Sequence, residues 1–194
     1  MNCLSECDGV AIDVIFVIDT SNSISDEQFE TMIDFMAKLV LSFDVSESNI
    51  HVAVITFANR PKAQIELLDY QERIPLAKAV YALHRQYGGS YTFCAIDLVL
   101  EHGLLEEYGA RPGVPKVGVV VVDGKSADPE RTELRAAEAR QAGIRMIAVG
   151  IGDAVDMDEL KQIAGDDRLV YTVGGFDTLH EHIEPVAKST CKGE

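Results

Sequence analysis

Short apolar runs alternate with stretches of helical periodicity along almost the whole chain, and this alternation restricts the possible folds more than any other feature. The apolar runs lie at 13–19, 51–58, 64–67, 116–122, 145–149 and 169–173. The helical patterns lie at 26–43, 72–84, 93–107, 129–142, 157–164 and 178–188. Strands separated by helices predict a mostly parallel sheet with helices on both faces.

One connection breaks this pattern. Only about five residues separate Ala58 from Gln64, too few for a helical crossover, so the run 64–67 is predicted to be a short antiparallel edge strand. The predicted fold class is therefore α/β, a doubly wound sheet in a single domain, 1–194. A chain of 194 residues is long enough to bury a sizeable core.

The first apolar run ends in a carboxylate followed by two hydroxyls. Residues 14–18 are continuously apolar, as expected for a central strand buried on both faces, and Asp19, Ser21 and Ser23 follow at alternate positions. Oxygen-only ligands favour Mg²⁺, Mn²⁺ or Ca²⁺. The alternative is a plain polar loop that caps the next helix, since Ser25 and Gln28 have capping-box spacing. Both interpretations can hold together.

Two further loops are expected at the same edge of the sheet. Asp123 follows the run 116–122, and the segment Gly88–Thr92 precedes the next helical pattern and would bring Ser90 or Thr92 to the edge. The helix N-terminus there disfavours a cation, so this loop is expected to orient water or a partner's carboxylate. Taken singly, Asp123-Gly124 and Gly88-Gly89 also fit ordinary turns.

Composition excludes several functions. The formal net charge of −15 argues against binding a nucleic-acid backbone. No apolar run approaches the length of a membrane span, and the N-terminus lacks an apolar signal core, so a secretory signal is expected to be absent or already removed. No G-x-G-x-x-G follows the first run, and the five histidines form no catalytic set. We expect no enzymatic activity.

Three segments together resemble the von Willebrand factor type A domain with its metal-ion-dependent adhesion site. They are Asp19-x-Ser21-x-Ser23, GGSYT at 88–92 and PGVPKVGVVVVDGKSAD at 112–128. AVGIGDAVDMDELKQIA at 148–164 also matches the family's fifth strand and following helix. The resemblance covers about residues 12–188, and the matrilins and the A domains of non-fibrillar collagens are the most similar members.

The resemblance implies a Rossmann-like sheet, a Mg²⁺ or Mn²⁺ site at its top edge and adhesion to matrix proteins. By position, Ser21 and Ser23 would ligate the metal directly, and Asp19 and Asp123 directly or through water. The family's next ligand is a threonine within GGxTxTGxAL, whereas GGSYTFCAI here is one residue shorter. Thr92 is assigned to the metal set, while Ser90 and Tyr91 are expected to contact the ligand, and Ser90 is the alternative to Thr92. Val122 also replaces a common threonine, so weaker metal binding is expected.

The four cysteines are constrained by this fold. Cys3, Cys7 and Cys191 would gather at the bottom edge, whereas Cys94 would lie beside the metal loop as a small buried residue. A strand of six residues spans about 20 Å, beyond the reach of a disulfide. At most one bridge is expected among the terminal three, with Cys7–Cys191 favoured, which suits a secreted module. The remaining cysteine would be free or linked to another chain. A reduced cytosolic protein is the alternative.

Two functional hypotheses follow. The first is a secreted module of the extracellular matrix that binds an acidic side chain of a matrix protein, such as a collagen, through the cation. The second is a structural protein that assembles matrix, with or without mineral, through its acidic surface and its unpaired cysteine, largely without metal. Phosphotransfer through Asp19 is disfavoured because Ser21 stands where that chemistry usually needs a second aspartate.

Overall fold

The computed structural model describes residues 9–191 and contains one six-stranded sheet in the order β3-β2-β1-β4-β5-β6. The strands are β1 Ile12–Asp19, β2 Ile50–Phe57, β3 Pro61–Ile65, β4 Lys116–Val122, β5 Ile144–Ile151 and β6 Val170–Val173. All neighbouring strands pair in parallel except β2 and β3, which form the expected antiparallel hairpin. The predicted fold class is confirmed.

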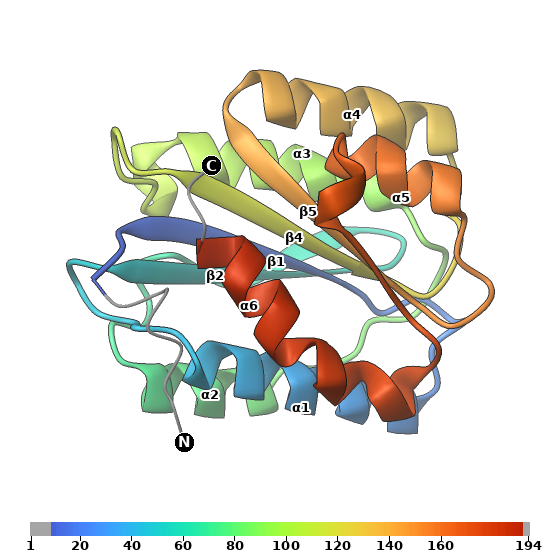
Figure 1. The fold of residues 1–194 in the computed structure, drawn as a ribbon, viewed down its shortest axis with the longest axis horizontal. Coiled ribbons are helices and arrows are strands. Elements are labelled where there is room, and N and C mark those ends of the chain that lie inside the picture. Colours follow the sequence, from blue (N-terminus) through green and yellow to red (C-terminus); the bar gives the residue numbers. More distant parts are fainter. Residues whose placement is uncertain (1–8, 192–194) are drawn as a thin grey trace.

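Helices cover both faces of this sheet (Figure 1). One face packs against α1 Asp26–Leu41, α2 Arg73–Tyr81 and α6 Ile183–Cys191. The other packs against α3 Thr92–Leu104, α4 Pro129–Gln141 and α5 Met157–Ala164. Three short 3₁₀ segments, Glu106–Tyr108, Asp167–Leu169 and Phe176–His182, complete the described elements.

The central position of β1 explains its sequence. Val14, Phe16 and Ile18 point into the core beneath α1, whereas Ile15 and Val17 point into the core beneath α3. Because successive side chains of a strand face opposite sides, a strand buried on both faces must be apolar throughout. The strand therefore carries Asp19 to the carboxyl edge of the sheet on a rigid, fully buried base.

Several predicted boundaries were wrong. The edge strand occupies 61–65 rather than 64–67, because Pro61, which has no backbone N–H, is accommodated at the first position of an edge strand. The predicted helix 178–188 is a 3₁₀ segment followed by α6, whose first turn holds Pro185. The predicted helix 93–107 ends at Leu104, and a 3₁₀ turn follows. The predicted helix 72–84 is shortened to residues 73–81.

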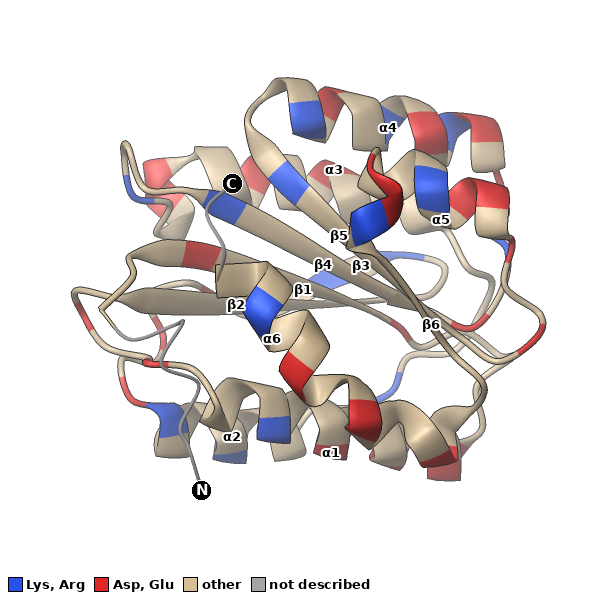
Figure 2. Ribbon diagram, viewed as in Figure 1, with Lys and Arg blue, Asp and Glu red and all other residues tan. Residues whose placement is uncertain are grey.

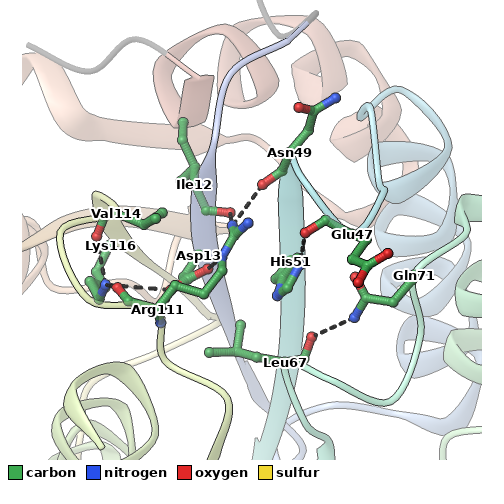
Figure 3. A network of polar contacts seen from close by, with 10 residues as sticks. All are labelled: Ile12, Asp13, Glu47, Asn49, His51, Leu67, Gln71, Arg111, Val114 and Lys116. Carbon is green, nitrogen blue, oxygen red and sulfur yellow. Dashed lines mark hydrogen bonds and ion pairs between the residues drawn. The ribbon is translucent and has the colours of Figure 1, made fainter. Parts of the chain in front are cut away.

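The amino edge of the sheet is held by a buried ionic network (Figure 3). The carboxylate of Asp13 is fully buried and accepts hydrogen bonds from the side chain and the backbone N–H of Arg111, at 2.7 and 2.8 Å. Arg111 also donates to the carbonyls of Ile12 and Asn49, and Lys116 lies 3.4 Å from Asp13. The network joins the starts of β1, β2 and β4.

Cys191 at the end of α6 is disulfide-bonded. Cys3 and Cys7, the predicted candidates for its partner, lie outside the described residues. Cys94 is free and half-buried rather than buried, and burial raises the pKa of its thiol. Within residues 9–191, no helix has the length and apolar character needed to cross a bilayer.

Candidate metal site

The winding direction of the sheet reverses between β1 and β4, which pair directly. Asp19 ends β1, and Asp123 follows the last residue of β4. Ligands of doubly wound sheets bind outside the carboxyl ends of strands at such a reversal. The two carboxylates expected at this edge therefore lie at the carboxyl ends of neighbouring strands.

A continuous chain of polar contacts joins these carboxylates through the first loop. Asp19 Oδ1 accepts a hydrogen bond from the backbone N–H of Ser21 at 2.7 Å. The Ser21 and Ser23 hydroxyls lie 2.9 Å apart, and Ser23 Oγ donates to Asp123 Oδ1 at 2.8 Å. The sequence placed all four side chains at one edge, and the structure brings them into contact.

The same loop also caps α1. Ser25 Oγ accepts a hydrogen bond from the backbone N–H of Gln28, and Gln28 Oε1 accepts one from the backbone N–H of Ser25. This reciprocal capping box fixes where the helix begins. The capping interpretation is confirmed, and it leaves Asp19, Ser21 and Ser23 on the sheet side of the cap.

The segment Gly88–Thr92 forms the third loop of the site. It brings Ser90 into direct contact with Asp19, where the first loop, residues 19–23, begins. Ser90 Oγ donates to Asp19 Oδ2 at 2.7 Å. Thr92 is the first residue of α3, is only 1% exposed, and its hydroxyl lies 3.5 Å from Ser90 Oγ. Tyr91 is 37% exposed beside them. The shortened loop therefore presents Ser90 to Asp19, with Thr92 behind it.

The two carboxylates are held mainly by neutral hydrogen-bond donors. Burial raises the pKa of Asp19, and the hydrogen bonds from Ser90 and Ser21 oppose this shift. Burial likewise raises the pKa of Asp123, opposed by the hydrogen bond from Ser23 and, more weakly, by the charge of Arg85. Neither residue takes part in an ion pair within residues 9–191. Negative charge buried in this way is stabilised by a bound cation.

The donor set suits a hard cation. No group of three or more His, Cys, Asp or Glu side chains in the described part of the chain is arranged to hold a metal. The side-chain oxygens gathered at this edge are those of two carboxylates and several hydroxyls. Such an all-oxygen set is typical of Mg²⁺, Mn²⁺ or Ca²⁺.

Several residues that support the site were not predicted from the sequence. Arg85 donates to the carbonyl of Ser21, and Asn59 Oδ1 accepts from the N–H of Gly89. Glu159 on α5 is buried and accepts from the N–H of Ser126, in the loop that carries Asp123. No local pattern marks these residues, because each acts on a loop far away along the chain.

A groove of about 560 Å³ adjoins Asp123. Among the described residues its lining holds four carboxylates and no Lys or Arg: Glu27, Gln28, Thr31, Asp123, Ile151, Gly152, Asp153, Ala154, Gly174, Gly175, Phe176 and Asp177. Figure 2 shows acidic segments on several loops at the end of the sheet where β4 and β5 finish.

Comparison with known proteins identifies similar chains. The model of the von Willebrand factor type A domain matches residues 13–185. Cuticlin-6 of Caenorhabditis elegans is 34% identical over 95% of this chain and 32% of its own length. Matrilin-3 of Gallus gallus is 32% identical over 95% of this chain and 41% of its own length. The chain thus spans less than half of these relatives.

Solved structures show the same fold. Proximal thread matrix protein 1 from the mussel byssus, in a form whose MIDAS motif is occupied by zinc, has a TM-score of 0.85 and 27% identity. The alignment covers 94% of this chain and 46% of that one. The TRAP protein of Plasmodium vivax, 19% identical with a TM-score of 0.77 over 92% of this chain and 74% of that one, supports the fold alone.

Proposed function

The chain belongs to the von Willebrand factor type A family, and on that premise we propose that it is a non-catalytic binding module that captures an acidic side chain of a matrix protein, such as a collagen, through a divalent cation. The chain is secreted and belongs to the extracellular matrix, as its matrilin, cuticlin and byssal relatives do. We also propose that residues 1–194 form a single domain of this family.

The observation that carries the proposal is the polar chain from Asp19 to Asp123. Asp19, Ser21, Ser23 and Asp123 would hold Mg²⁺, or else Mn²⁺ or Ca²⁺, with Ser90 as the oxygen from the third loop and Thr92 as the alternative. Zinc in the corresponding motif of the byssal protein supports a divalent ion here. Bound there, the cation would supply an open coordination position to the carboxylate of a partner.

The neutral hydroxyls determine how the site would act. They leave much of the charge of a divalent ion uncompensated, so an incoming carboxylate is attracted to it. Tyr91, which is 37% exposed, would contact the same partner.

Removing Asp19 tests the metal site. The Asp19→Ala variant should lose Mg²⁺ and Mn²⁺ binding in isothermal titration calorimetry while keeping the circular dichroism spectrum of the fold. Asp167→Ala, which removes an exposed carboxylate from the 3₁₀ segment before β6, is the matched control and should bind both metals normally. Unchanged metal binding by the Asp19 variant would refute the assignment.

A pair of hydroxyl variants tests the third loop. Ser90→Ala should weaken Mg²⁺ binding more than Thr92→Val, because the hydroxyl of Ser90 donates a hydrogen bond to Asp19 and lies between Asp19 and the hydroxyl of Thr92. If Thr92→Val weakens Mg²⁺ binding more than Ser90→Ala does, Thr92 is the ligand from this loop.

The acidic groove favours a second candidate function, in which basic side chains of a matrix partner bind largely without metal. Asp153 and Asp177 are exposed in its lining, and the half-buried Phe176 offers apolar surface to the aliphatic stem of a lysine or arginine. Capture on immobilised collagen that persists in EDTA, falls with salt and is weakened in the Asp153→Asn/Asp177→Asn double variant would support this candidate over the metal-dependent one.

A further inference from the structure

Arg85 lies in the segment between α2 and the third loop, and its side chain is only 10% exposed. Its Nη2 donates to the backbone carbonyl of Ser21 at 2.8 Å, and its Nη1 pairs with Asp26 Oδ1 at 2.6 Å. Its Nε is buried without a hydrogen-bond partner. Burying a guanidinium with an unsatisfied donor is costly. The contact with the loop of Ser21 therefore has to offset that cost.

The neighbours of Arg85 make further contacts between residues 85–88 and residues 21–26. The ring of Tyr87 covers the guanidinium, with its centroid 4.5 Å from Cζ, and its hydroxyl donates to Asp26 at 3.2 Å. Gly88 and Asn22 exchange two hydrogen bonds: the N–H of Asn22 donates to the Gly88 carbonyl, and the N–H of Gly88 donates to Asn22 Oδ1. We call this set of contacts the loop clasp.

The loop clasp acts on the backbone that orients two hydroxyls. No regular strand or helix fixes residues 20–24. The directions of Ser21 Oγ and Ser23 Oγ therefore depend on contacts made by the loop backbone. The planar guanidinium can bond Ser21 and Asp26 at the same time, which a lysine ammonium on a flexible stem does less well.

We propose that Arg85 is a positioning residue that holds the Asp19–Ser23 loop in its cation-binding conformation. This inference rests on the proposed metal site. Outer contacts that orient ligands typically alter metal affinity about 10- to 100-fold when removed. The positive charge of Arg85 acts in the opposite direction, because it repels a nearby cation, and Asp26, 75% exposed, offsets it through a solvent-screened pair.

Two substitutions separate position from charge. Arg85→Gln removes the charge and the two-pronged contact, whereas Arg85→Lys keeps the charge and loses the planar fork. If the main role of Arg85 is to position the loop, both variants weaken Mg²⁺ binding about tenfold or more in calorimetry. If charge repulsion dominates, Arg85→Gln binds Mg²⁺ more tightly than the wild type, and the inference fails.

Two further variants complete the series, and the first is the control. Arg73→Gln removes a charge from the exposed start of α2 and should bind Mg²⁺ as the wild type does. Tyr87→Phe removes one hydrogen bond of the loop clasp but keeps the ring over Arg85, so it should weaken Mg²⁺ binding less than either Arg85 variant.

Hydrogen exchange in metal-free protein provides a second readout. Arg85→Gln should accelerate exchange of the Ser21 and Asn22 amides, which donate to Asp19 and Gly88, and leave the amides of β1 unchanged. Unchanged loop exchange, or faster exchange with unaltered Mg²⁺ affinity, would overturn the inference while leaving the metal site intact. Absence of Mg²⁺ and Mn²⁺ binding in the wild type would instead refute the proposed function.

Discussion

Two buried aspartates at opposite ends of β1 are accommodated in different ways. Asp13, at the amino end, is neutralised by Arg111 and lies near Lys116. Asp19, at the carboxyl end, receives hydrogen bonds from Ser21 and from the Ser90 hydroxyl. A buried charge that is paired serves the fold, whereas one held by neutral donors alone remains available to a cation.

His51 at the amino edge is expected to make stability depend on pH. It is 3% exposed, its Nε2 contacts the Glu47 carbonyl at 3.1 Å, and its Nδ1 is buried without a partner. Burial, aided by the charge of Arg111 and opposed by Asp13 and Glu47, lowers the pKa of His51 below 6.5. The unfolded chain therefore takes up a proton before the folded protein does, so stability is lost as the pH falls below 6.5.

We expect His51→Gln to reduce this loss. The difference in unfolding free energy between pH 7.5 and pH 5.5, measured by urea denaturation, should be smaller than in the wild type. His84→Gln, which changes an exposed histidine, is the control and should show the wild-type difference. Equal pH dependence in all three proteins would show that His51 titrates normally.

At the level of elements, the carboxyl edge is built from loops that brace one another. The third loop bonds to the first through Gly88 and Asn22, and its Ser90 carbonyl accepts from the N–H of Ala127 in the loop after β4. Asn59, in the β2–β3 turn, supports Gly89. The position of each polar side chain at the site therefore depends on loops contributed by different strands.

Gly88→Ala should disturb this edge more than its size suggests. Gly88 has a φ of +141°, and a Cβ there would lie 2.4 Å from the Asn59 side chain. Such backbone strain typically costs about 1–3 kcal/mol. We expect a loss of unfolding free energy in that range by urea denaturation, together with weaker Mg²⁺ binding.

Gly124→Ala is the matched control. Its added Cβ would meet no atom within 4 Å, and its φ lies outside the left-handed region. We expect a change below about 0.5 kcal/mol. Similar losses at Gly88 and Gly124 would argue against the strain at Gly88.

At the scale of the molecule, the two helical layers bury both faces of the sheet, and the last helix ends in a disulfide-bonded cysteine. Cys191 at the end of α6 is 3% exposed and disulfide-bonded, whereas Cys94 is free. Cross-links stabilise mainly by restricting the unfolded chain.

Cys191→Ser should lower the unfolding free energy by about 2–5 kcal/mol, and reductant should have a similar effect on the wild type. Cys94→Ser should change stability little under either condition. A wild-type protein whose thermal midpoint does not respond to reductant would contradict a stabilising bridge.

The sequence alone predicted most elements and the residues proposed for the site. The runs that became β1, β4 and β5 were recognisable because a strand buried on both faces must be apolar throughout. The start of α1 at Asp26 followed from the capping box of Ser25 and Gln28, which lie within one turn. These signals are local, so the sequence expresses them directly.

Tertiary structure decided how the loops meet. Arg85 and Ser21 are 64 residues apart, and Ser23 and Asp123 are 100 apart, so their contacts exist only because β1 and β4 pair and α2 packs beside α1. The choice between Ser90 and Thr92 at Asp19 likewise depended on where the shortened third loop enters α3. Hydrogen-bond geometry between distant segments follows from packing, which no local pattern in the sequence reveals.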